Sequence, residues 1–126
     1  MSGMADGIYL QSLVSLINDK VMNILFVCSM NQWRSPTAEA IFKNSSIHNV
    51  RSAGTGTSGN ARIKISQALI GWADMIFVME KQHKQIMIER FRIDKQIIVL
   101  DIPDEYKYMD PELIEMIKTS VAPYLE

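Results

Sequence analysis

The chain alternates between short apolar runs and longer segments whose apolar positions recur every three or four residues. The runs 22–28, 50–53, 74–79 and 95–100 predict strands, and the segments between them predict helices. Runs as apolar as MNILFVC and DMIFVM favour strands that are buried on both faces, as in a parallel sheet covered by helices on each side. We therefore expect an α/β fold, a three-layer α/β/α sandwich with a four-stranded parallel sheet.

The predicted helices carry start signals typical of helix N-termini. Ser35 is placed to cap the helix that follows the first strand, with Pro36 at its first helical position. Asp110 and Pro111 take the same two places in the last helix. The helices are expected at 35–44, 63–73, 80–91 and 110–125.

The first 21 residues stand apart from this alternation. Apolar positions between Ile8 and Asp19 recur at near-helical spacing and predict a short helix in an N-terminal extension, 1–21. Residues 22–126 then form one α/β domain, in keeping with the length of 126 residues. The extension lacks the basic start and cleavage site of a secretory signal, and no apolar run approaches the roughly 20 residues of a membrane span.

Charge and cysteine content narrow the function classes. With 13 basic and 14 acidic residues the formal net charge is -1, so no nucleic acid or membrane surface is expected as a partner. Cys28 is the single cysteine, which points to a reducing cytoplasm. His48 and His83 are isolated and are expected to face solvent, so we predict no metal and no cofactor.

The candidate chemistry lies where the predicted strands end. Ligands of open α/β sheets bind beyond the carboxyl ends of the strands, and Cys28, Gly54, Glu80 and Asp101 all lie at such ends. Cys28 is followed six positions later by Arg34, just before a helix begins. The backbone N–H groups of the intervening loop and the positive end of the helix can together form a nest for an anion.

The same geometry would activate Cys28 as a nucleophile. A helix N-terminus favours the thiolate over the thiol, and Arg34 can offer two parallel N–H donors to phosphoryl oxygens. Ser35 could donate to the sulfur and Asn31 could brace the loop. The expected phosphate-binding set is Ser29, Met30, Asn31, Gln32, Trp33, Arg34 and Ser35. The competing interpretation of Cys28 is a small buried hydrophobic residue.

These residues carry a family resemblance. VCSMNQWRSPTAEA resembles the phosphate-binding loop of low-molecular-weight protein tyrosine phosphatases, with its Cys-x5-Arg-Ser/Thr pattern and an asparagine at the place of Asn31. VRSAGT, ADMIFVME and QIIVLDIPDEY resemble the later strands and turns of that family. The resemblance implies a cysteine-dependent phosphomonoester hydrolase, a protein tyrosine phosphatase, that forms a thiophosphate on Cys28. It also implies a phosphorylated protein or small aryl phosphate as substrate and a supporting role for Ser52.

The resemblance further implies a general acid on the loop after the fourth strand. The family's acid is an aspartate directly before a proline. Asp101 is favoured by its place at the strand end and Asp104 is the second choice, while Asp110 is interpreted as a helix cap.

The chain departs from the family pattern at the rim of the expected pocket. Met30 replaces a loop glycine and Trp33 precedes the arginine. Because both positions lie at the rim and not at the floor of the expected pocket, the resemblance predicts the type of reaction better than it predicts the substrate. Trp33, Tyr106 and Tyr108 could wall a pocket for an aryl phosphate or could be half-exposed core residues. A lone cysteine excludes the cysteine relay of arsenate reductases on this fold.

Two other functions stay open at this stage. The altered acid loop could have lost its proton donor, which would leave a non-catalytic module that binds phosphate or phosphoproteins. GTGTSG, residues 54–59, is a Gly-x-Gly-x-x-Gly match and could mark a nucleotide-binding protein. The preceding strand is short and half polar, which disfavours that interpretation.

Overall fold

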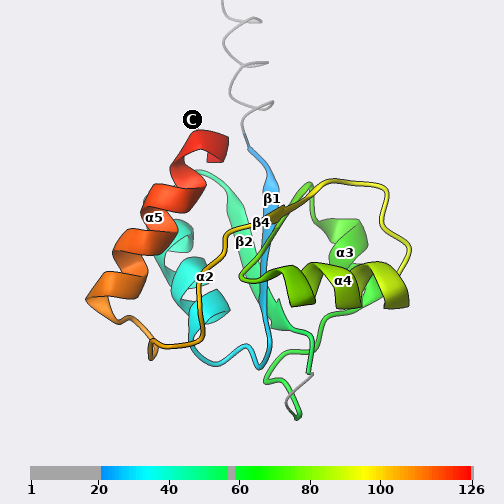
Figure 1. The fold of residues 1–126 in the computed structure, drawn as a ribbon. Helices are drawn as coiled ribbons and strands as arrows, with labels where there is room; N and C mark the ends of the chain where they lie inside the picture. Colours follow the sequence, from blue (N-terminus) through cyan, green and yellow to red (C-terminus); the bar gives the residue numbers. More distant parts are fainter. Residues whose placement is uncertain (1–20, 57–58, 126) are drawn as a thin grey trace, which may run out of the picture.

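The computed structural model describes residues 21–56 and 59–125 as a parallel sheet between two pairs of helices (Figure 1). The strands follow the order β2-β1-β3-β4 across the sheet, and every neighbouring pair is parallel. This confirms the predicted α/β sandwich with four parallel strands. The elements are β1 (Asn23–Cys28), α2 (Arg34–Ser45), β2 (Asn49–Gly54), α3 (Gln67–Trp72), β3 (Met75–Val78), α4 (Lys81–Arg90), β4 (Ile97–Val99) and α5 (Pro111–Leu125).

The sheet separates two apolar layers. Helices α2 and α5 cover one face and α3 and α4 cover the other (Figure 1). Phe26 of β1 lies in the first layer, where its ring stacks on those of Phe42 and Phe77 at centroid distances of 5.6 and 5.2 Å. Alternate β1 residues, Leu25 and Val27, point into the second layer. Burial on both faces explains why the strand sequence contains no charge.

The register brings the strand ends to one edge of the sheet. Cys28 pairs with Gly54 at the ends of β1 and β2, and Val27 pairs with Val78 of β3. Parallel strands place their carboxyl ends together, so the loops after β1, β2, β3 and β4 meet there. The candidate site is built from these four loops.

Two predicted helix starts differ from the structure. Ser35 is not an N-cap, because α2 begins at Arg34 and Trp33 takes the capping position without a side-chain hydrogen bond. The helix expected at 63–73 is shorter, since Ser66 accepts a hydrogen bond from the N–H of Leu69 and caps a helix that begins at Gln67. Residues before Ser66 instead run alongside β2, where Lys64 forms a bridge with Gly54.

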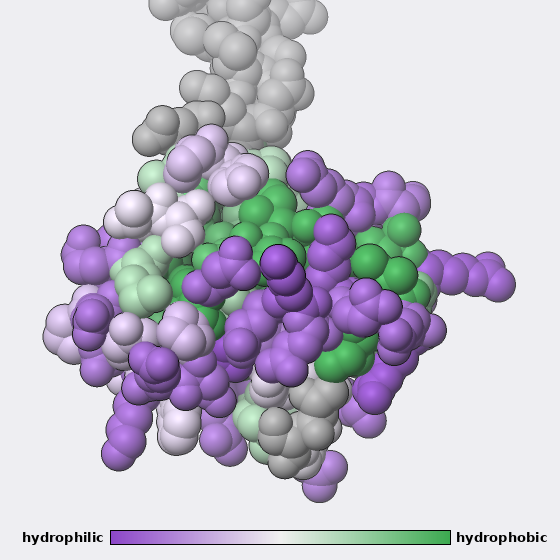
Figure 2. Space-filling view, viewed as in Figure 1, coloured by the Kyte–Doolittle hydropathy of each residue, from purple (hydrophilic) through white to green (hydrophobic). Residues whose placement is uncertain are grey.

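Polar residues cover much of the face seen in Figure 2, and apolar residues show through at its centre and on its right side. None of the helices in residues 21–56 and 59–125 is long and apolar enough to cross a membrane. The predicted helix between Ile8 and Asp19 lies outside the described residues.

Candidate active site

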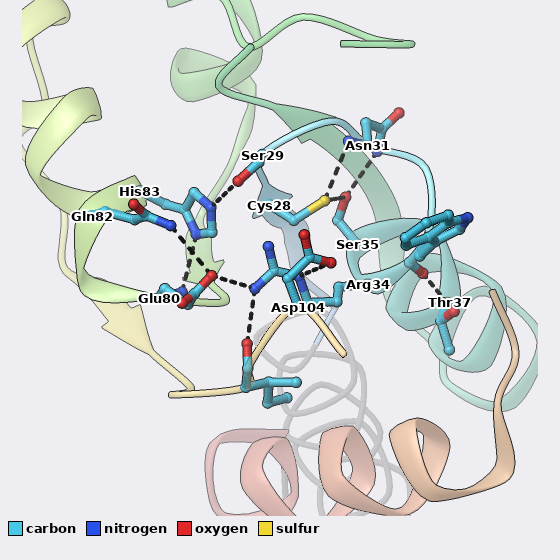
Figure 3. A network of polar contacts seen from close by, with 12 residues as sticks. Cys28, Ser29, Asn31, Arg34, Ser35, Thr37, Glu80, Gln82, His83 and Asp104 are labelled. Atoms are coloured by element: carbon cyan, nitrogen blue, oxygen red, sulfur yellow. Dashed lines mark hydrogen bonds and ion pairs between the residues drawn. The ribbon is translucent and has the colours of Figure 1, made fainter. Parts of the chain in front are cut away.

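Cys28 lies at the end of β1 in the centre of the site (Figure 3). Its sulfur is 2.9 Å from the Ser35 hydroxyl oxygen and accepts a hydrogen bond from the backbone N–H of Asn31 at 3.2 Å. The residue is buried, and yet it lines a small pocket of about 40 Å³. A cysteine that lines a pocket and whose sulfur has two polar neighbours does more than fill the core.

The loop after Cys28 turns its carbonyl groups outward. Four successive carbonyl oxygens accept hydrogen bonds from the segment that follows β2. This arrangement fixes the loop from outside, as an anion-binding nest requires. The four bonds are Thr55 N to Cys28 O at 2.9 Å, Gly56 N to Ser29 O at 2.8 Å, Arg62 N to Met30 O at 3.0 Å and Arg62 Nε to Asn31 O at 3.1 Å.

Asn31 braces the loop from within. Its backbone is in the left-handed region with φ of 55°, and its side-chain amide donates to the hydroxyls of Ser35 and Ser52, both at 2.9 Å. The Ser52 hydroxyl in turn donates to the Glu39 carboxylate at 2.6 Å. The structure thus brings Asn31, Ser35 and Ser52 together. Glu39 completes the chain of bonds and was not among the predicted site residues.

Arg34 is held in a fixed direction at the first position of α2. The side chain is only 2% exposed, and its Nη1 donates to Glu80 Oε1 at 2.6 Å and to the carbonyl oxygen of Ile102 at 2.8 Å. Both of these partners engage the same terminal nitrogen. The Nε edge faces Asp104, whose nearest oxygen is 3.7 Å away. A guanidinium anchored at one nitrogen can present its remaining donors to a tetrahedral anion.

The two candidate acids, Asp101 and Asp104, lie in different places in the structure. Asp104 lines the Cys28 pocket, whereas the favoured Asp101 lies in a different hollow with Glu80 and Pro103. Asp101 has φ of 57°, and the chain turns there before it reaches the pocket. The chain thus brings a carboxylate to the pocket only three residues beyond Asp101, at Asp104.

Two residues at the start of α4 complete the site. Glu80 lies 2.6 Å from the Arg34 guanidinium. Burial acts to raise the pKa of Glu80, but the hydrogen bond and charge of Arg34, with smaller contributions from His83 and Gln82, leave that pKa lowered. His83 is fully buried, and its ring lies 2.8 Å from the Ser29 hydroxyl. The prediction that His83 and His48 face solvent was wrong, since both are buried. The spacing of Glu80 and His83, which reciprocally cap α4, is the signal that sequence reasoning missed.

Gly54 permits the close approach of β2 to the loop after Cys28. A Cβ atom at Gly54 would lie 2.7 Å from the Ser29 carbonyl oxygen and 2.9 Å from the Asn31 nitrogen. The N–H groups of Gly54 and Gly56 already donate to carbonyl oxygens, those of Ile63 and Ser29. Among the described residues after this turn, 59–66, no helix begins, and the next helix, α3, starts only at Gln67; a dinucleotide-binding fingerprint requires a helix start directly after the turn.

The rim of the pocket contains the residues that depart from the family pattern. Met30, Gln32 and Trp33 line the pocket beside Cys28, and Trp33 is 41% exposed. Gln32 also borders a larger hollow of about 600 Å³ along α2, which contains Tyr108. Tyr106 packs against the core instead.

Within residues 21–56 and 59–125, no group of three His, Cys, Asp or Glu side chains is arranged to hold a metal ion.

Comparisons with known proteins agree with this geometry. Residues 23–69 match the family model described as low molecular weight phosphotyrosine protein phosphatase. A protein-arginine-phosphatase of Bacillus subtilis (strain 168) is 34% identical over 95 residues, which represent 56% of this chain and 63% of that protein. The match therefore spans less than two thirds of the relative.

Solved structures extend the similarity over most of the chain. A low molecular weight protein tyrosine phosphatase from Bacillus subtilis has a TM-score of 0.62 and 27% identity, covering 83% of this chain and 100% of that one. A YwlE arginine phosphatase mutant with a phosphorylated active site serine has a TM-score of 0.61 and 27% identity, covering 82% of this chain and 95% of that one. The present chain is therefore similar to low molecular weight protein tyrosine phosphatases, in sequence over residues 23–69 and in fold over most of its length.

Proposed function

We propose that this chain is a cysteine-dependent phosphatase that acts on phosphorylated proteins and forms a thiophosphate on Cys28. The observation that carries the proposal is the Cys28 sulfur at the floor of a loop whose carbonyl groups are bound from outside, beside the anchored Arg34. Such a loop binds a tetrahedral anion and leaves the sulfur in line behind the phosphorus. The similarity to phosphatases of both tyrosine and arginine residues supports the same reaction class.

The reaction has two steps. The Cys28 thiolate attacks phosphorus and forms the S–P bond while the bond from phosphorus to the leaving atom breaks, and Asp104 gives its proton to that atom. Water then attacks the thiophosphate, its proton passes to the Asp104 carboxylate, and inorganic phosphate leaves as the S–P bond breaks. Ser35 stabilises the departing sulfur from 2.9 Å. Arg34 holds the phosphoryl oxygens through both steps.

Two phosphorylated side chains fit the rim. The family resemblance favours phosphotyrosine, and the 34% identical relative is a protein-arginine-phosphatase, which makes phosphoarginine the second candidate. Both leaving groups are planar, and the exposed indole of Trp33 can stack on a phenol ring or on a guanidinium. The larger hollow along α2, with Lys43 and Arg62, has room for the polypeptide next to the phosphorylated residue.

One assay separates these substrates and tests the reaction. Purified protein is given para-nitrophenyl phosphate, a phosphotyrosine peptide and a phosphoarginine peptide, and released phosphate is measured. We expect turnover of at least one substrate and none by Cys28→Ser, which should still bind inorganic phosphate. Phosphate binding without turnover by the unaltered chain would instead indicate a non-catalytic phosphoprotein-binding module. Full activity of Cys28→Ser would rule out the mechanism.

A further inference from the structure

His83 is a buried histidine whose two ring nitrogens have defined partners. The backbone N–H of Glu80 donates to Nδ1 at 3.0 Å, and the Ser29 hydroxyl lies 2.8 Å from Nε2 (Figure 3). The ring is fully buried between α4 and the phosphate-binding loop. It joins the loop after β3 to the first residue after Cys28.

The hydrogen bond from Glu80 settles the direction of the other bond. A backbone N–H is only a donor, so Nδ1 must accept and carries no proton. In a neutral imidazole the proton then resides on Nε2, which donates to the Ser29 oxygen. Burial, with a further contribution from the Arg34 charge, lowers the pKa of His83 to about 4, so the ring is neutral at physiological pH. The charged groups that influence the ring are Arg34, Glu80 and Asp104.

Ser29 consequently has a proton left to give. Its hydroxyl oxygen accepts from His83, and in the described part of the chain no other side chain or carbonyl group takes its hydrogen. The residue is 6% exposed and lines the same pocket as Cys28, Arg34 and Asp104. A bound oxyanion is the acceptor that this hydroxyl lacks.

We propose that Ser29 is a further catalytic residue, whose hydroxyl donates a hydrogen bond to the phosphoryl group, and that His83 is the positioning residue that orients it. The proposal rests on the proposed phosphatase function. It adds a neutral donor on the side of the pocket near α4, which complements the charged donor Arg34. A neutral donor stabilises the anion without competing for Glu80 or Asp104.

The first experiment compares Ser29→Ala, Ser29→Thr, His83→Leu and the double variant Ser29→Ala/His83→Leu. We expect Ser29→Ala to weaken inorganic phosphate binding and kcat/KM by roughly 3- to 10-fold, the range for one neutral hydrogen bond. Ser29→Thr keeps the hydroxyl and should restore most of the loss. The double variant should lose no more than the larger single loss, because His83 acts through Ser29. Ser45→Ala, which removes a hydroxyl bound within α2, is the matched control.

Calorimetric titration with inorganic phosphate keeps the two proposals separable. If no substrate is turned over but Ser29→Ala still weakens phosphate binding, the phosphatase proposal fails and the Ser29 donor stands. If Ser29→Ala binds phosphate and turns over substrate like the unaltered chain, the Ser29 proposal fails alone.

Nitrogen-15 NMR of the histidine side chains gives a readout that needs no variant. A His83 ring protonated on Nδ1 would also overturn the proposal.

Discussion

Protonation of His83 should destabilise the fold in mild acid. Its ring is fully buried and has a pKa of about 4, against 6.5 for an exposed histidine. The unfolded chain therefore binds this proton at a higher pH than the folded chain, and stability falls as the pH drops from 6.5 toward 4. The difference between the two pKa values lowers the free energy of unfolding by roughly 3 kcal/mol below about pH 4. About 2 kcal/mol of this stability is already lost by about pH 5.

Urea unfolding of the unaltered chain and of His83→Gln, measured at about pH 7.5 and about pH 5, isolates this contribution. His83→Gln is expected to be less stable than the unaltered chain at the higher pH, since the amide replaces a ring that caps α4. Between the two pH values, however, its free energy of unfolding should fall by about 2 kcal/mol less than that of the unaltered chain. His48→Gln is the matched control, because it leaves His83 as the only histidine and should keep most of the slope. An unchanged slope in His83→Gln would refute the reasoning.

Further changes probe the other parts of the site. Asp104→Asn should slow hydrolysis of poor leaving groups far more than of good ones, as seen in kcat/KM over a series of aryl phosphates, whereas Asp101→Asn should leave the series nearly unchanged. Gly54→Ala should lower the free energy of unfolding by roughly 1–3 kcal/mol, because its Cβ would clash with the Ser29 carbonyl oxygen; an unaltered urea midpoint would contradict this. Glu80→Gln should weaken phosphate binding by loosening Arg34, with Glu89→Gln on the exposed side of α4 as control. EDTA should leave the rate unchanged.

The fold was predictable because its signals are local. Apolar runs such as MNILFVC admit few structures other than a strand buried on both faces, and alternation with helices leaves the parallel sandwich. Cys28 and Arg34 could be placed in one loop because only five residues separate them. The helix start was less predictable, since Ser35 can cap a helix or bind a sulfur, and tertiary contacts with Cys28 and Asn31 decided between these roles.

The residues that complete the site come from distant parts of the chain. Glu80 reaches Arg34 across 46 positions and His83 reaches Ser29 across 54, and no sequence pattern encodes those distances. The placement of Asp104 at the pocket and of Asp101 outside it likewise depends on how the loop after β4 turns.

The sequence by itself determined the layers of the fold and placed Cys28 and Arg34 in one loop, because these features depend on hydrophobic periodicity and on neighbours along the chain. Only the tertiary structure decided which carboxylate lines the pocket, which groups anchor Arg34 and which side chain hydrogen-bonds to the Ser29 hydroxyl. Those properties are set by directions and distances between side chains on different strand ends, and they exist only once the parallel sheet has brought these ends together.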